Sequence, residues 1–517
     1  MINVMVNMIQ QTLITRTFNV LRRKSNFITI VILLLLTLYP LVVAYNYPYA
    51  HLGDDAFITL TYSKNIARGN GFVFNHPPAV LGTTTPLFAI IIALLSVVLS
   101  QIDMRIITVF FSAACWIGIV YTFFLFRKAW GFTKWEACII AFVVIGLGLR
   151  TWLQMEAYLF AFLLTLSFSL FYSHHYTLSG FTTGLLFLTR GEGMLLLPIF
   201  IVSILIKRLT NKVSTKILIK NSLEILAGFS IIAVIWFIFA NYTFGSFLPN
   251  TLSAKRAQGL AAMQNLTAPT NVFLYHLTTR WVNLWIERYS LLILISIIGL
   301  IGSFVKNRKH LIWAGWIGSY IAGYSLLNAP GYPWYQLPIL FVIKIFISLG
   351  LIEILGELFR KVRAKNLIAI PLLILTVPSL YLVARPVLNY KPWIGDNPRG
   401  KSYVILSQWF RDNAKKNESV AFIEIGYLGY YTDNRIIDLA GLILPDIVPY
   451  VAKGDFSSSF WRYNPDYYVY LPDFDWALAG IRANPRFDLE YQAVATLPGP
   501  GKNDFTIYKR RPLPTNN

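Results

Sequence analysis

The sequence predicts an α-helical protein that crosses a membrane many times and ends in a small α/β domain. Two features of the composition support the membrane part: 56% of the 517 residues are hydrophobic, and only 13% are charged. A soluble domain usually carries roughly 25% charged residues. The mean hydropathy of +0.55 agrees with this class. After about residue 385 the composition becomes mixed and polar, which marks the start of the α/β domain.

Apolar runs close to the length of a membrane-spanning helix recur through the first three quarters of the chain. The longer runs lie at 27–45, 86–100, 104–126, 136–149, 157–172, 223–240, 290–305, 311–327, 336–357 and 366–384, and shorter ones at 178–189 and 193–206. They predict about 11–12 transmembrane segments in a domain formed by residues 1–385. No small-residue cleavage site follows the first run, so we expect no cleavable signal peptide.

The basic residues indicate which loops face the cytoplasm. Much of the net charge of +21 lies in short loops between apolar runs, which is the positive-inside pattern and not a nucleic-acid-binding surface. These residues are Arg22, Arg23, Lys24, Lys207, Arg208, Lys212, Lys216, Lys220, Lys306, Arg308, Lys309, Arg360, Lys361, Arg363 and Lys365. Loops 46–81 and 242–289 and the domain 386–517 then face the opposite side. We expect a multi-pass protein of the plasma (inner) membrane with these parts outside the cytoplasm.

One segment conflicts with this topology. Runs 86–100 and 104–126 would together return the chain to the outside, whereas the basic residues that follow, Arg127 and Lys128, favour the inside. We expect residues 82–100 to enter the membrane without crossing it, because the Thr-Thr-Thr-Pro segment is a poor start for a spanning helix. Full crossing is the alternative, since proline is tolerated in membrane helices.

Motifs for several other chemistries are absent from the sequence. The two cysteines, Cys115 and Cys138, lie within apolar runs, which favours buried thiols over a disulfide or a metal site. The chain has no Walker loop, no GxGxxG after a strand and no HExxH motif.

Residues 386–517 are expected to form the α/β domain, and about 130 residues are ample for a separate core. The segment SYVILSQWFRDNAKKN has helical periodicity. The runs ESVAFIEIG, RIIDLAG, PDYYVYL and DFTIYKR predict strands, and YLGYYTDN separates the first two.

Unusual polar residues gather on one side of the predicted membrane part. Asp54 and Asp55 directly follow the first span, and an Arg-Gly-Glu step lies between two apolar runs. Ionisable residues at membrane level suggest a functional site. The candidate set is Asp54, Asp55, Lys64, Glu156, Arg190, Glu192, Asn250, Lys255, Tyr332, Trp334 and Tyr335. Singly, the lysines also fit solvated or snorkelling side chains, and the aromatic residues fit an interfacial belt.

A carboxylate pair with cations at a similar depth and apolar surroundings fits sugar transfer from a polyprenyl phosphate. The lipid tail would lie in the bilayer, with the phosphate at headgroup level and the sugar outside. A carboxylate would accept the proton of the incoming hydroxyl, and cations would stabilise the departing phosphate. Direct displacement would invert the anomeric centre.

Six motifs in order resemble one enzyme family. They are DDAFITLTYSKNIARGNGFVFN at 54–75, GTTTPLF at 82–88, QMEAYLF at 154–160, LTRGEG at 188–193, FLPNTLSAK at 247–255 and GYLGYYTDNRIIDLAGL at 426–442. Together they resemble GT-C-fold glycosyltransferases that use polyprenyl-phosphate sugars, and are most similar to the terminal arabinofuranosyltransferase-like branch. The family's usual Arg-Pro-Glu-Gly reads Arg-Gly-Glu-Gly here, which keeps both charges.

The resemblance implies a GT-C-like fold and a role for each candidate. Asp54 matches the general base, and Asp55 would orient the acceptor or support a cation. Arg190, Lys255 and Asn250 would bind the donor phosphate. The remaining candidates would line the cavity or contact substrate: Glu156, Glu192, Lys64, Tyr332, Trp334 and Tyr335. The resemblance leaves open whether the protein uses a divalent cation, because some members of the family use one and others do not.

The sequence leaves the substrates and two alternative functions open. The acceptor is a glycan, a glycolipid or a protein, and tyrosines such as Tyr427 and Tyr430 offer flat faces either for sugar rings or for core packing. The alternatives are a transporter or flippase of lipid-linked saccharide, or a diphosphate-linked oligosaccharide polymerase or ligase. An interfacial carboxylate pair and the lack of an internal repeat argue against a transporter.

Overall fold

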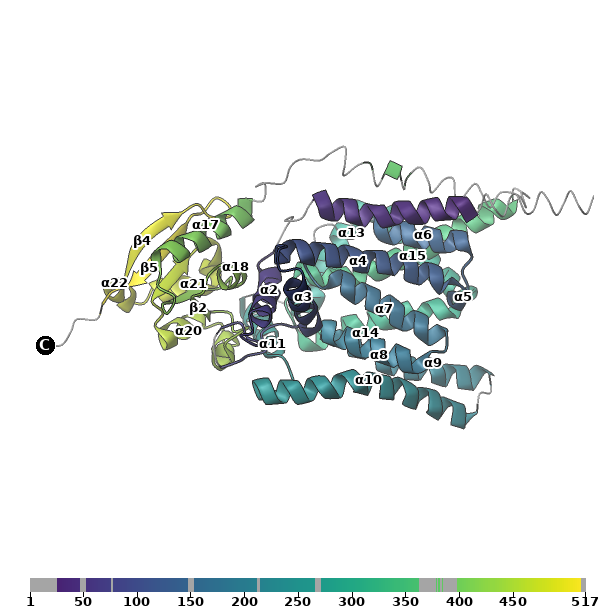
Figure 1. Cartoon of the computed structure of the whole chain (residues 1–517), viewed down its shortest axis with the longest axis horizontal. Coiled ribbons are helices and arrows are strands. Elements are labelled where there is room, and N and C mark those ends of the chain that lie inside the picture. The colour runs from purple at the N-terminus through teal and green to yellow at the C-terminus, as the bar shows by residue number, and fades with distance from the viewer. Residues whose placement is uncertain are drawn as a thin grey trace, which may run out of the picture.

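The computed structural model describes residues 26–46, 53–75, 78–146, 153–211, 214–265, 271–361 and 398–512, together with residues 378, 380, 381 and 384. The predicted span 366–384 lies almost wholly outside the described residues, as do the predicted boundary at residue 385 and the basic cluster Arg22–Lys24. The described chain forms a helical bundle up to Lys361 and a C-terminal domain at 398–512 (Figure 1).

Long apolar helices lie side by side in the bundle (Figure 1). They are the N-terminal helix (Asn26–Asn46), α4 (Met104–Leu125), α6 (Lys134–Gly146), α7 (Ala157–Tyr172), α8 (Tyr176–Thr189), α9 (Leu196–Asn211), α10 (Thr215–Phe244), α13 (Asn283–Val305), α14 (Leu311–Leu327) and α15 (Gln336–Lys361). Among the described residues, five helical stretches are long and apolar enough to cross a membrane: Asn26–Asn46, Met104–Leu125, Thr215–Phe244, Val272–Val305 and Pro333–Leu358.

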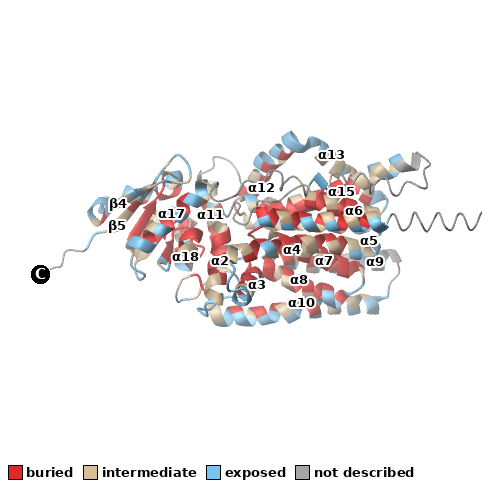
Figure 2. Ribbon diagram, turned by 45° about the horizontal axis from the view of Figure 1, so that its top comes forward, coloured by how far each residue is buried: buried red, intermediate tan, exposed pale blue. Residues whose placement is uncertain are grey.

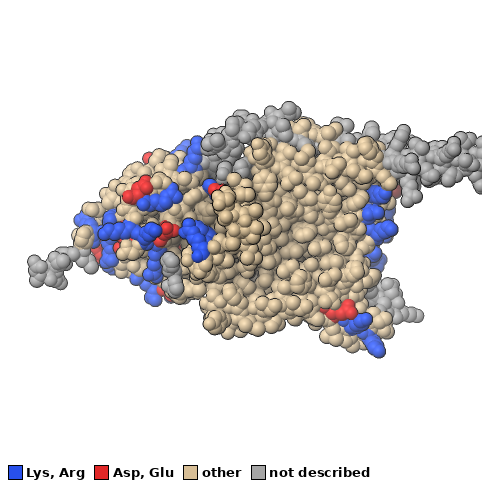
Figure 3. Space-filling model, in the orientation of Figure 1, with Lys and Arg blue, Asp and Glu red and all other residues tan. Residues whose placement is uncertain are grey.

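The surface of the bundle is that of a membrane protein. On the face shown in Figure 3, charged residues occupy the two ends of the molecule and a broad uncharged band separates them. Helix α10 lies in this band and leaves large apolar side chains exposed, among them Ile235 at 65% and Ile238 at 67%. Buried residues follow the interior of the bundle (Figure 2). An extended exposed apolar surface marks contact with lipid, so the chain is a multi-pass integral membrane protein.

Glycines allow two pairs of helices in the bundle to approach closely. A Cβ atom on Gly180 of α8 would lie 2.0 Å from the carbonyl oxygen of Ile225 in α10, and one on Gly228 of α10 would lie 2.0 Å from Thr177 O. Gly299 of α13 and Gly350 of α15 form an equivalent pair across their helices, each 2.0 Å from a facing carbonyl oxygen. Within lipid, helices are not driven together by the hydrophobic effect. Small residues at such crossings let the backbones pack closely, and this packing stabilises the helix pair.

Two shorter helices, α2 (Asp54–Ala67) and α3 (Pro86–Val98), stand across the direction of the long ones at the end that carries the C-terminal domain (Figure 1). Shortly after α3 ends, Arg105 at the start of α4 donates a hydrogen bond to the Tyr431 hydroxyl of the C-terminal domain at 2.7 Å. Both ends of α3 therefore lie at the same end of the bundle. This placement agrees with the expectation that residues 82–100 enter the membrane without crossing it.

The C-terminal domain is built around a five-stranded sheet with the strand order β2-β1-β3-β5-β4. Strands β1 (Ser419–Phe422), β2 (Arg435–Asp438) and β3 (Tyr467–Tyr470) are parallel, and β4 (Tyr491–Leu497) and β5 (Phe505–Arg510) run antiparallel. Helices α17 (Pro398–Asn413), α20 (Phe456–Tyr463), α21 (Asp475–Arg482) and α22 (Arg486–Glu490) complete the domain. The sequence predicted α17 and four of the strands but not β4, which is mostly exposed and lacks an apolar alternation.

The C-terminal domain joins the bundle through α18 (Gly426–Tyr431), which packs along α2. The Phe57 ring of α2 lies 4.3 Å from the Tyr427 ring and 5.1 Å from the Tyr430 ring, measured between centroids. These tyrosine rings are therefore packing groups at the junction. A Cβ atom on Gly426 would lie 1.9 Å from the Asp54 carbonyl oxygen, so only glycine permits this contact.

Candidate active site

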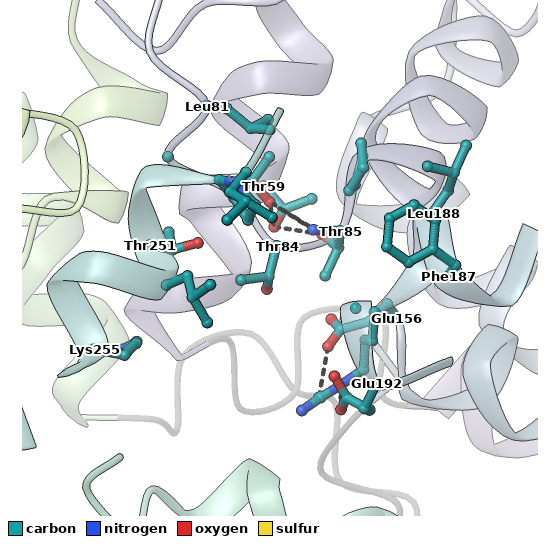
Figure 4. Close-up of a pocket in the computed structure, with 18 of the residues that line it drawn as sticks. Thr59, Leu81, Thr84, Thr85, Glu156, Phe187, Leu188, Glu192, Thr251 and Lys255 are labelled. Atoms are coloured by element: carbon teal, nitrogen blue, oxygen red, sulfur yellow. Dashed lines mark hydrogen bonds and ion pairs between the residues drawn. The ribbon is translucent and has the colours of Figure 1, made fainter. Parts of the chain in front are cut away.

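A cavity of about 370 Å³ opens in the bundle beside α2 and α3, and we call it the bundle cavity. Most of its wall is apolar. Its charged lining residues are Asp55, Glu156, Arg190, Glu192 and Lys255. In Figure 4, Glu156 and Glu192 lie on one side, and Lys255 approaches from the opposite side on α11 (Asn250–Asn265). The structure thus brings together charged side chains that are up to 200 residues apart in the sequence.

A second cavity of about 700 Å³ lies between the bundle and the C-terminal domain, and we call it the interdomain cavity. The bundle contributes Asp54, Asp55 and Lys255 to its wall, and the C-terminal domain contributes Arg399 and Glu424. Five aromatic residues also line it: Tyr332, Trp334, Phe456, Phe474 and Trp476. The two cavities share six lining residues: Asp55, Ile58, Met155, Lys255, Trp334 and Leu442. A carboxylate and an ammonium group therefore stand on the wall between them.

The two adjacent carboxylates at the start of α2 have different surroundings. The Asp54 carboxylate accepts hydrogen bonds from the backbone N–H groups of Gly426 at 2.9 Å and Tyr427 at 3.0 Å, one on each oxygen. Asp55 makes no hydrogen bond or ion pair with the described residues, and it borders both cavities. Burial raises the pKa of both carboxyl groups; the charge of Glu424 raises that of Asp54 further, whereas Lys255 opposes the rise for Asp55.

Arg190 is held in a buried ion triad by two carboxylates. Its Nη1 donates to Glu156 at 2.9 Å and its Nε to Glu192 at 2.6 Å, and the side chains of Arg190 and Glu156 are each only 6% exposed. The Tyr324 hydroxyl lies 3.3 Å from both Arg190 and Glu192. Buried charges of this kind need partners, and Arg190 has one donor on each carboxylate and a third directed at the Tyr324 hydroxyl. With both carboxylates ionised, the triad carries a net negative charge.

Lys255 differs from Arg190 because aromatic rings, and not carboxylates, surround it. Its Nζ lies 4.0 Å from the centroid of the Tyr332 ring and 5.5 Å from that of Trp334. Within the described chain no Asp or Glu oxygen lies within ion-pairing distance of it. Cation–π contacts hold an ammonium group without neutralising its charge. Lys255 therefore remains available to an anion in either cavity.

Two predicted site residues lie elsewhere. Asn250 was expected to contact the donor phosphate, but its side-chain amide donates to the carbonyl oxygens of Gly441 at 2.8 Å and Leu442 at 2.9 Å, and it does not line the bundle cavity. Lys64 was expected at the cavity, but its Nζ donates to the carbonyl oxygens of Gly429 and Tyr430 at the end of α18. Both side chains thus satisfy backbone groups at the domain junction.

The structure places the other candidates in the cavities and adds residues that the sequence did not single out. Trp334 and Tyr335 line the bundle cavity, and Tyr332 lines the interdomain cavity. Arg399 and Glu424 form an ion pair in the interdomain cavity. Neither carried a local signal, because Glu424 lies within the predicted strand run ESVAFIEIG and Arg399 lies in a polar segment before a predicted helix. The described residues contain no group of three His, Cys, Asp or Glu side chains arranged to hold a metal ion.

The helical bundle, the apolar cavity at one end and the attached α/β domain define a GT-C-like membrane fold, as the sequence predicted. The structure is similar to the oligosaccharyltransferase AglB from Archaeoglobus fulgidus in complex with an inhibitory peptide and a dolichol-phosphate, with a TM-score of 0.56, 14% identity and coverage of 88% of this chain and 72% of that chain.

It is similar also to ArnT from Cupriavidus metallidurans, bound to undecaprenyl phosphate (TM-score 0.55, 13% identity) and in the apo state (TM-score 0.55, 12% identity), each covering 92% of this chain and 97% of that chain. At these identities the likeness is one of fold. Residues 396–508 match the model of a domain of unknown function, DUF8728. No curated protein matches the chain.

Proposed function

We propose that this protein transfers a sugar from a polyprenyl-phosphate donor to a hydroxyl of a cell-envelope glycan, glycolipid or protein, with inversion, on the outer side of the plasma (inner) membrane. The observation that carries the proposal is the shared wall between the two cavities, because Asp55 and Lys255 both line the bundle cavity and the interdomain cavity. The lipid phosphate then occupies the bundle cavity and the acceptor occupies the interdomain cavity. Two similar folds were solved with a polyprenyl phosphate bound, which supports the class of donor.

Asp55 is the general base of the proposed reaction, and Asp54 is a positioning residue. The sequence-based prediction gave the base role to Asp54. We favour Asp55 because both oxygens of Asp54 already accept backbone N–H groups of α18, whereas Asp55 faces both cavities. A base must reach the proton that it abstracts in a plausible substrate position.

The proposed step is a single displacement. The acceptor hydroxyl loses its proton to Asp55 while its oxygen forms a bond to the anomeric carbon. The bond from that carbon to the phosphate oxygen breaks, and its electron pair remains on the phosphate. Lys255 stabilises the growing negative charge, and a cation already in place contributes most when the cavity excludes water. The leaving phosphate needs no acid, because it departs as a stable anion.

The assay for this proposal measures acceptor-dependent release of undecaprenyl phosphate by the purified full chain. Undecaprenyl-phosphate sugars serve as donors, and extracted cell-envelope glycans, glycolipids and proteins serve as acceptors. Asp55→Asn is expected to lower the rate by about 100-fold or more, as for loss of a general base. Asp54→Asn keeps one acceptor oxygen for the N–H groups of α18 and is expected to lower the rate by about tenfold or less.

Other outcomes of the same assay contradict specific parts of the proposal. A slow Asp54→Asn variant beside a fast Asp55→Asn variant returns the base role to Asp54. If the wild-type chain releases no undecaprenyl phosphate yet moves the donor across a liposome membrane, the transporter alternative replaces the transferase. Release of undecaprenyl diphosphate from a diphosphate-linked donor favours a polymerase or ligase.

A further inference from the structure

Threonine side chains line the wall of the bundle cavity that faces the Arg190 ion triad. They are Thr59 from α2, Thr83, Thr84 and Thr85 from the segment before α3, and Thr251 from α11. Figure 4 shows Thr59, Thr84, Thr85 and Thr251 on one side of the cavity and Glu156 and Glu192 on the other. The mechanism above uses none of these hydroxyl groups.

The segment that carries the threonines is fixed against α2. The hydroxyl oxygens of Thr59, Thr83 and Thr85 form a triangle with sides of 3.2, 3.2 and 3.1 Å. The Tyr62 hydroxyl accepts the N–H of Gly82 at 2.8 Å and donates to the carbonyl oxygen of Val80 at 2.6 Å. These bonds hold the segment in one conformation before any ligand arrives.

The N-terminus of α3 points into the same place. Thr85 is its N-cap residue and Pro86 its first residue, both line the cavity, and the Thr85 side chain makes no capping hydrogen bond. The first N–H groups of a helix carry a partial positive charge and favour an anion when no side chain caps them. Pro86 presets the helical backbone at no cost in hydrogen bonds, because an N–H at this position has no partner within the helix.

Thr251 supplies an independent indication of a ligand. It is 4% exposed, it lines the cavity, and its hydroxyl has no hydrogen-bond partner among the residues that the structure describes. A buried polar group without a partner is unfavourable, so such a group needs an explanation. The backbone N–H of Asn250 donates to the carbonyl oxygen of Leu81 at 3.0 Å, which ties the start of α11 to the threonine segment.

The charges in the cavity also favour this wall for an anion. Arg190 on the opposite wall is bonded to Glu156 and Glu192, so a phosphate there would approach two carboxylates. Lys255 lies one turn along α11 from Thr251 and has no carboxylate partner among the described residues. Residues four apart share one face of a helix. The Lys255 and Thr251 side chains therefore project from the same face of α11, and both residues line the bundle cavity.

We propose that Thr84, Thr251 and Lys255, at the N-terminus of α3, form the binding site for the phosphate of the polyprenyl donor, and that Arg190 is a structural ion. This inference rests on the proposed function for the identity of the donor. Hydroxyl donors hold the phosphate in the ground state and donate more strongly as its charge rises during departure. We call Thr84, Thr251 and Lys255 the phosphate cradle.

The test is a binding measurement that needs no turnover. Native mass spectrometry of the full chain in detergent, titrated with undecaprenyl phosphate, gives the dissociation constant. The Thr84→Val/Thr251→Val double variant is expected to bind at least about tenfold more weakly, because valine keeps the shape and removes both hydroxyls. The Thr84→Ser/Thr251→Ser variant keeps both hydroxyls and is expected to bind within about twofold of the wild type. Thr122→Val, which removes a helix-internal hydroxyl bonded to Gly118 O, is the matched control and should not change binding.

Undecaprenol, which has the same tail without the phosphate, separates phosphate recognition from packing. The proposal expects the valine variants to bind undecaprenol as the wild type does. Three results would overturn the cradle. The double valine variant could bind both lipids equally weakly, or it could bind undecaprenyl phosphate as tightly as the wild type. The serine variant could also lose binding of undecaprenyl phosphate. A wild-type chain that does not bind undecaprenyl phosphate overturns it too. Binding as expected but without sugar transfer would leave the cradle standing and reject the transferase.

Discussion

Glu424 is a carboxylate at the wall of the interdomain cavity whose ionisation is opposed by its surroundings. Burial raises its pKa to about 7, and the Asp55 and Asp473 carboxylates add to the rise, while its ion pair with Arg399 opposes it. Its Oε2 has no hydrogen-bond partner within the described part of the chain. In the proposed reaction this oxygen is available to a hydroxyl of the acceptor.

This pKa shift predicts how stability changes with pH. The folded state binds the Glu424 proton more tightly than the unfolded state, so stability falls as the pH rises from about 4.5 to about 7. The ionisation of Glu424 lowers the free energy of unfolding by on the order of 3 kcal/mol at most over this range. Glu424→Gln cannot ionise and should remove that part of the pH dependence, so the variant gains stability relative to the wild type as pH rises.

Thermal unfolding of the detergent-solubilised full chain between pH 5 and pH 8 measures this difference. Asp438 also has a raised pKa through burial, and its contribution cancels because Glu424 does not affect it. The pKa of Asp54 falls when the Glu424 charge is removed, and this change acts in the same direction as the expected gain in stability. A difference between variant and wild type that does not change over this range would contradict the assignment.

At the scale of single elements, α2 holds both ends of α18. Asp54 accepts the first backbone N–H groups of α18, and Lys64 donates to the carbonyl oxygens at its end. A negative charge at the start of a helix and a positive charge at its end both complement the helix dipole. The sequence pattern did not predict α18, because six residues rich in Gly and Tyr show no helical period. Its caps lie more than 360 residues away in the chain.

Lys64→Met should therefore loosen the C-terminal domain from the bundle. Loss of a charge-assisted hydrogen bond costs about 1.5–3 kcal/mol, so hydrogen exchange of the backbone amides at 426–431 is expected to accelerate by about tenfold or more. Arg68→Met is the matched control, because the Arg68–Asp433 ion pair is 3.5 Å long with both side chains more than half exposed. Such a pair contributes little. Equal acceleration in the two variants, or none in Lys64→Met, would show that Lys64 does not hold α18.

At the scale of the whole molecule, the proposed orientation is open to chemical labelling. The side chain of Lys416 in the C-terminal domain is 86% exposed, and Arg308 is exposed between α13 and α14, among the basic residues predicted to face the cytoplasm. In intact cells a membrane-impermeant maleimide should label Lys416→Cys but reach Arg308→Cys only after permeabilisation. The native Cys115 and Cys138 are buried and give little background. The reverse labelling pattern would place the active site in the cytoplasm.

The parts of the molecule that could be predicted from the sequence are those whose signal is local. Long apolar runs indicated the long helices, and short strand-like runs indicated β1, β2, β3 and β5. The resemblance brought Asp55, Glu156, Arg190 and Lys255 to one site, and all four line the bundle cavity. It did not show that Arg190 forms ion pairs with two carboxylates or that Asn250 donates hydrogen bonds to carbonyl oxygens. The tertiary structure determines which groups these side chains bind.

The unpredicted part of the site consists of residues whose type is common. Threonines in membrane proteins frequently donate to a carbonyl oxygen in the preceding turn, as Thr122 does here. Nothing in the sequence distinguishes Thr251 from such residues. It is marked as a candidate ligand by its burial in the cavity wall without a hydrogen-bond partner among the described residues.

The shared wall between the cavities has a kinetic consequence for the proposed reaction. The donor arrives by lateral diffusion within the lipid, whereas a glycan or protein acceptor arrives from the aqueous side, so neither obstructs the path of the other. They can occupy the protein simultaneously and in either order, and no covalent sugar–protein species is needed to carry the sugar between them. The spent lipid can likewise diffuse away while the lengthened product is still bound.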